Sequence, residues 1–164
     1  MPETPGELSS RRFAFFGEKR MLSCYDVAQY FLAKADEDAG DLMSNLKLQK
    51  LVYYAQGFAL AFFDKPLFSE RIEAWTHGPV ILALYHEYKG YGAAAIPPPP
   101  ILDFSKYDQE TRALLDEVYT VYGQFAAWKL RNMTHKEPPW CNTPEGNEIT
   151  HDALRAYFKT QVDV

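Results

Sequence analysis

The sequence predicts an all-α protein, a compact single domain of about six helices around a buried central helix at about residues 47–63. Three observations support this. The chain has 164 residues, a length that suits one domain. Apolar residues recur every three or four positions in several segments, which is the period of an α-helix. Segment 47–63 is apolar on nearly all sides, which is typical of a helix inside a core. We expect at most a minor strand pair, near residues 67–75.

The N-terminal residues 1–20 have a different composition from the rest. They contain two prolines, a Ser-Ser pair and mixed charges, without a helical period. We therefore expect a flexible N-terminal extension, followed by one domain over residues 21–160. Met21 stands directly before the first helix signal, so the extension is either a real arm or the product of an upstream start codon.

The first two helices are predicted from their capping residues. Ser23 with Asp26 three positions later resembles a capping box, and the helix that follows should end near Asp36. Ser44 can cap the central helix. The pair Lys65–Pro66 should stop that helix, because proline cannot continue it.

The segment after the central helix is short and irregular. Ile72, Ala74 and Trp75 could form one extended stretch. At His77-Gly78-Pro79 we expect the next helix to begin, since proline is well placed at a first helical position. Gly90 should end that helix. The four prolines at 97–100 favour an extended loop lying across the core.

The C-terminal third continues the helical period. Ser105 with Asp108 offers a capping pair for a helix that Gly123 bends or breaks, and a further helix covers 124–133. Pro138–Pro139 prevents its extension, and a turn-rich loop follows over 141–148. Thr150 caps the last helix.

The charge balance excludes several classes of function. The formal net charge is −5. A nucleic-acid partner is not expected, because phosphate binding needs a basic footprint, and only the 11–20 arm with its four basic residues offers one. Apolar stretches are too short to cross a bilayer, so no membrane partner is expected. Two cysteines form no disulfide framework, which favours the cytoplasm.

No motif for catalysis, metals or cofactors is evident. The four histidines lack metal-ligand spacing, and no glycine-rich phosphate loop is present. The run from His135 to Cys141 resembles the zinc-deaminase pattern only superficially, because the second cysteine is missing. We therefore predict no catalytic residue, no metal site and no cofactor.

Aromatic residues are abundant, and most should pack in the core. Tyrosine also anchors many protein interfaces. Four tyrosines are therefore candidates for a partner-binding patch: Tyr53, Tyr85, Tyr88 and Tyr91.

Several longer stretches, in this order, resemble a known family. They include KLQKLVYYAQG at 47–57, EAWTHGPV at 73–80, THKE at 134–137 and Pro139-Trp140. Together they are similar to the SocA-like antitoxin family, also called the Panacea domain and linked to the phage-associated protein GepA. The resemblance covers about residues 21–160. It marks as family-motif core residues Trp75, His77, Gly78, Pro79, His135, Glu137 and Trp140.

The resemblance implies a helical antitoxin of a bacterial or prophage toxin–antitoxin pair that neutralises a cognate toxin by direct binding. A first alternative is a proteolytic adaptor that delivers the toxin to the ClpXP protease. A second is a metal- or histidine-dependent enzyme with a pocket at His77 and His135. A third is a DNA-binding autoregulator that uses the 11–20 arm. The acidic charge suits a toxin with a basic active surface.

Overall fold

The computed structural model describes residues 8–9, 21–37 and 42–163. It is 58% helical, with seven α-helices and a small antiparallel pair of strands, which confirms the predicted all-α class. The α-helices are α1 (Cys24–Glu37), α2 (Asn45–Phe63), α3 (Leu82–Tyr88), α4 (Gln109–Tyr122), α5 (Ala127–Thr134), α6 (Pro138–Cys141) and α7 (His151–Lys159). The strands are β1 (Leu8–Ser9), β2 (Ile72–Trp75), β3 (Gly78–Ile81) and β4 (Val162–Asp163). The described residues also form the short 3-10 helices η2 (Lys89–Tyr91) and η3 (Phe104–Lys106).

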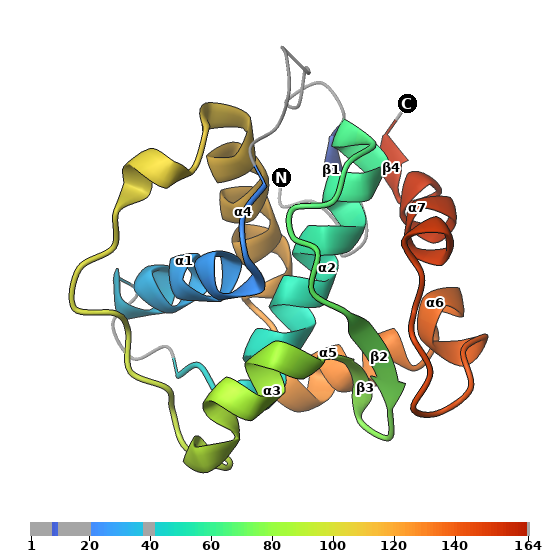
Figure 1. Ribbon diagram of the computed structural model, residues 1–164, viewed down its shortest axis with the longest axis horizontal. Helices are drawn as coiled ribbons and strands as arrows, with labels where there is room; N and C mark the ends of the chain where they lie inside the picture. Colours follow the sequence, from blue (N-terminus) through green and yellow to red (C-terminus); the bar gives the residue numbers. More distant parts are fainter. Residues whose placement is uncertain (1–7, 10–20, 38–41, 164) are drawn as a thin grey trace.

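Helix α2 runs through the middle of the molecule, as its all-round apolar pattern predicts. It packs against α1, α4, α5 and α7, which surround it (Figure 1). From residue 47 to residue 60 every residue is buried, including polar Gln49, Lys50 and Gln56. The central helix of the prediction is therefore confirmed, and its polar side chains must find partners inside the protein.

Most predicted helix caps are confirmed. In α1 the Asp26 amide donates to Ser23 Oγ and the Ser23 amide donates to the Asp26 carboxylate. Ser44 accepts from the Lys47 amide at 3.2 Å, and Thr150 accepts from the Ala153 amide at 3.1 Å. These local bonds satisfy amides that the first helical turn leaves free.

The prediction that Ser105 and Asp108 form a capping pair for one helix is wrong. Asp103 caps the 3-10 turn η3, and Asp108 itself caps α4 by accepting from the Thr111 amide at 2.8 Å. The carboxylate of Asp108 therefore stands where the serine was expected, because α4 begins one turn later than the Ser105 signal indicates.

The segment after His77 is a strand and not the start of a helix. Gly78–Ile81 pairs antiparallel with Ile72–Trp75, in the register Trp75↔Gly78 and Ile72↔Ile81, and α3 begins only at Leu82. The prediction that Pro79 occupies the first position of a helix is therefore wrong. Gln49 on α2 explains the difference: its Oε1 accepts from the Ile81 amide at 2.8 Å, and its Nε2 donates to the Ile81 carbonyl at 3.4 Å.

The C-terminal part folds back over α2. Helix α5 ends at Thr134 before the two prolines, but Pro138 then opens the short helix α6, which the pattern did not predict. Helix α7 lies along α2, where Gly57 leaves room for the Phe158 ring. The predicted 1–20 extension lies outside the described residues except for β1, which pairs in parallel with β4.

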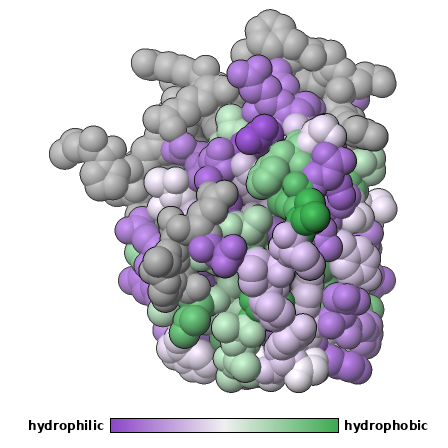
Figure 2. Space-filling model, turned by 90° about the vertical axis from the view of Figure 1, so that its left-hand side faces the viewer, coloured by the Kyte–Doolittle hydropathy of each residue, from purple (hydrophilic) through white to green (hydrophobic). Residues whose placement is uncertain are grey.

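The distribution of hydrophobic residues was considered both on the surface and along the helices. The face turned to the viewer in Figure 2 is mostly hydrophilic or pale, with hydrophobic colour in small separate spots where atoms are not grey. Of the helices in the described ranges, none has the length and apolar character needed to cross a membrane.

Candidate functional site

The family-motif residues come from two distant stretches, 75–79 and 135–140, which the fold brings together beside α2. Trp140 Nε1 donates to the Trp75 carbonyl at 2.8 Å and so ties α6 to the end of β2. The His135 ring stacks on the Trp140 indole with a centroid distance of 3.9 Å and an interplanar angle of 3°. Burial and the nearby Arg131 charge lower the pKa of His135. These motif side chains therefore fasten the β2–β3 hairpin to the segment after α5.

Glu137 is a buried carboxyl group held by α2. The Tyr53 hydroxyl donates to Oε1 at 2.9 Å, and the Tyr54 hydroxyl donates to Oε2 at 2.7 Å. Burial raises the pKa of Glu137 to about 7, although both hydroxyl bonds act in the opposite direction. The group is therefore poised between its neutral and its charged form near neutral pH.

Lys50 is a second buried ionisable group, and sequence reasoning missed it. Its Nζ donates to the Pro79 carbonyl at 3.2 Å, and no part of the side chain is exposed. Burial, with Arg131 as a secondary cause, lowers the pKa of Lys50 to about 7. The lysine thereby holds the hairpin from below, as Gln49 does one residue earlier.

The backbone conformation of Gly78 and its close neighbours explain why a glycine stands at this position of the motif. Its φ is +106°, a region that side chains rarely adopt, and an added Cβ would lie 2.7 Å from Thr134 Oγ1 and 2.8 Å from Lys50 Cε. Only glycine lets the hairpin approach α2 and α5 this closely.

His77 lies at the exposed hairpin turn and contacts α5. Its ring centroid is 5.8 Å from that of Trp128, and Arg131 Nε donates to His77 Nδ1 at 3.4 Å. The Arg131 guanidinium in turn lies over the Trp128 ring, 4.5 Å from its centroid. Trp128 is 56% exposed. We call these three residues, His77, Trp128 and Arg131, the turn cluster.

A hollow of about 530 Å³ opens beside the turn cluster. Its wall includes His77 but not His135. Its lining residues come from α2, the hairpin, α3 and two loops: Asn45, Leu46, Gln49, Lys50, Trp75, Thr76, His77, Val80, Tyr85, Gly92 and Glu145.

The four candidate tyrosines lie in different environments. Tyr53 is fully buried against Glu137, so its placement on a partner-facing patch is corrected. Tyr88 is only 9% exposed. Tyr85 packs against Trp75 at a centroid distance of 4.7 Å and lines the hollow, and Tyr91 is 42% exposed. Tyr85, beside the hairpin, and Tyr91 thus reach the surface.

The described residues were also searched for metal-ligand clusters and reactive thiols. Within 8–9, 21–37 and 42–163, no three His, Cys, Asp or Glu side chains gather in a way that could hold a metal ion. Burial raises the pKa of the Cys24 thiol to about 12, which keeps it protonated. Cys141 is exposed, and its thiol donates to the His135 carbonyl.

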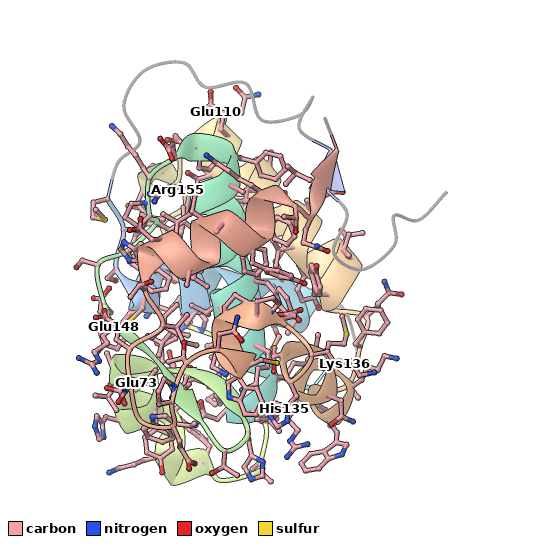
Figure 3. The ribbon with its side chains drawn as sticks, turned by 90° about the vertical axis from the view of Figure 1, so that its right-hand side faces the viewer. Glu73, Glu110, His135, Lys136, Glu148 and Arg155 are labelled. Atoms are coloured by element: carbon pink, nitrogen blue, oxygen red, sulfur yellow. The ribbon has the colours of Figure 1, made fainter. Side chains whose placement is uncertain are left out.

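Figure 3 shows how these residues are distributed on one side of the molecule. His135 and Lys136 lie at the end of α5, whereas Glu73 and Glu148 lie at the opposite edge of this view.

Sequence reasoning also missed Trp128 and Arg131. The available signal was a short helix that carries an aromatic residue and basic residues without any acidic one.

Comparison with known proteins gives one match. No curated protein and no solved structure matches the chain. The model of one family, "Antitoxin SocA-like, Panacea domain", matches residues 48–141, which is more than half of the chain and contains all seven motif residues. The chain belongs to the SocA-like antitoxin family, with a Panacea domain.

Proposed function

We propose that this protein is a cytoplasmic antitoxin that neutralises a cognate toxin by covering it. The family supports an antitoxin role. Neutralisation by contact needs a rigid surface with anchors and no reactive group. The proposal assigns no catalytic role to any residue.

One observation carries this proposal: side chains beneath the hairpin hold its backbone or one another by hydrogen bonds, and the hairpin turn lies at the surface. Lys50 and Trp140 bind carbonyls of Pro79 and Trp75, and Glu137 accepts from two tyrosines. The result is a fixed turn beside the hollow, with His77 exposed. A preformed surface of this kind loses little conformational entropy on binding.

Co-expression tests the proposal. The product of the neighbouring gene is tested as the toxin: it is produced from an inducible promoter, and growth is followed with and without this chain. We expect growth to be restored while the amount of toxin, followed by immunoblot, stays constant. The same experiment in cells without ClpX should give the same rescue.

Two outcomes would contradict direct neutralisation. A fall in toxin level that depends on ClpX would favour the proteolytic adaptor. Loss of rescue in His77→Ala or His135→Ala variants that still bind the toxin at full strength would favour the histidine-dependent enzyme. A non-cognate toxin serves as the control for general effects on growth.

A further inference from the structure

The segment around α5 has a charge opposite to that of the whole chain. Residues 127–136 contain Lys129, Arg131 and Lys136 and no acidic residue, whereas the chain carries a net charge of −5. Lys129 and Lys136 are exposed. Arg131 contacts Trp128, Lys129 lies on an adjoining side of the short helix, and Lys136 follows the end of the helix. We call these four residues the α5 patch.

The basic side chains of the α5 patch have no acidic partner among the described residues. Arg131 donates to Asn132 and to His77, and Lys129 Nζ lies 5.9 Å from the Phe125 ring centroid. Ion pairs such as Lys34–Asp116, Lys106–Asp26 and Arg155–Asp64 join other side chains. In Figure 3 the labelled carboxylates Glu73 and Glu148 lie far across the view from Lys136. Glu145 is the acidic residue among those that line the hollow, and its carboxylate accepts from the Thr76 hydroxyl.

Trp128 adds a large apolar surface to this charge. The residue is 56% exposed, and the Arg131 guanidinium lies over one face of its indole. Tryptophan and arginine are the residue types that carry most binding energy in protein interfaces. The contact with Arg131 fixes the indole before a partner arrives, which lowers the entropic cost of binding.

We infer that the α5 patch is the surface that receives the toxin, and that the toxin presents to it an acidic segment with an apolar side chain. The inference rests on the proposed antitoxin function. Complementary charge favours an acidic partner over a basic one at this surface, in spite of the acidic net charge of the chain. A nucleic acid fits less well, because three basic residues on an acidic protein offer a small footprint for an extended polyanion.

Charge reversal with a matched control tests the inference. The variants are Lys129→Glu, Arg131→Glu and Lys136→Glu, with Trp128→Ala for the apolar contact. The control is Lys159→Glu, an exposed lysine in the last turn of α7. Affinity for the purified toxin is measured by calorimetry, and circular dichroism verifies that each variant is folded.

We expect each α5-patch variant to weaken toxin binding by about tenfold or more, and Lys159→Glu to change it by less than about twofold. Reversing the contacting acidic residue of the toxin to lysine should restore binding to the glutamate variants. Equal effects of the patch variants and the control would overturn the inference while the proposed function stands. Binding of a 20-base-pair DNA duplex that is lost in the patch variants, with toxin binding intact, would also overturn it. If the unaltered chain binds no toxin, the proposed function itself fails.

Discussion

Glu137 and Lys50 are buried groups whose pKa values approach neutrality from opposite sides. Burial raises the pKa of Glu137 from 4.5 to about 7 and lowers that of Lys50 from 10.5 to about 7. Between pH 4.5 and 7 the folded state binds more protons than the unfolded state at Glu137. Between pH 7 and 10.5 the unfolded state binds more protons at Lys50. Stability from these groups therefore falls with pH up to about 7 and rises above it.

Replacing Glu137 by glutamine should flatten the acidic half of this profile. The amide keeps an oxygen for the tyrosine hydroxyls and does not ionise, so the fall in stability between pH 4.5 and 7 should shrink by up to about 3 kcal/mol. Urea unfolding at half-unit pH steps measures this. An unchanged slope would show that Glu137 does not titrate with a raised pKa.

Replacing Lys50 by methionine should remove the alkaline half. Methionine has a similar shape but no charge, so stability should no longer rise between pH 7 and 10.5. The loss of the Nζ bond leaves the Pro79 carbonyl unpaired, which should cost about 1–3 kcal/mol at high pH. The same urea series gives the result, and a persisting alkaline rise would contradict it.

At the scale of elements, the position of the hairpin depends on Gly78. Gly78→Ala should destabilise the protein for two reasons, a positive φ and a Cβ that meets Thr134 and Lys50. Gly146→Ala is a matched control, because Gly146 also has a positive φ, of 83°, but open space around it. We expect Gly78→Ala to cost about 1–3 kcal/mol more than the control in chemical unfolding. Equal costs would mean that the close approach contributes nothing.

The packing of α7 on α2 depends on Gly57 in the same way. A Cβ there would lie 2.2 Å from the Phe158 ring. Gly57→Ala should therefore lower the free energy of unfolding by about 1–3 kcal/mol, despite the better helix propensity of alanine. Gly90→Ala, with no atom within 4 Å, should change it by less than about 0.5 kcal/mol. Thermal melts of both variants decide the matter.

The elements that the sequence predicts well depend on local interactions. The caps at Ser23, Ser44 and Thr150 join residues three apart, so the sequence contains both partners side by side. Strand β3 depends instead on Gln49, thirty-two residues before Ile81. A pattern read along the chain cannot supply that partner, and so Pro79 resembles a helix start.

At the scale of the whole molecule, the sequence likewise does not predict the contacts that build the candidate site. The family resemblance predicted the motif residues from 75–79 and 135–140, but not that Lys50 lies beneath Pro79 or that His77 meets Arg131. Those contacts join three segments far apart in the sequence. The same holds for charge: the net charge of −5 does not reveal that the residues of the α5 patch are basic.

Binding of the two purified proteins tests the central claim most directly. The chain is titrated calorimetrically into the proposed cognate toxin, and toxin activity is assayed in the same mixture without protease, nucleotide or other cellular component. We predict a saturable complex of fixed stoichiometry, with activity falling in proportion to the complex formed. A toxin that stays fully active in the presence of excess chain would contradict neutralisation by contact.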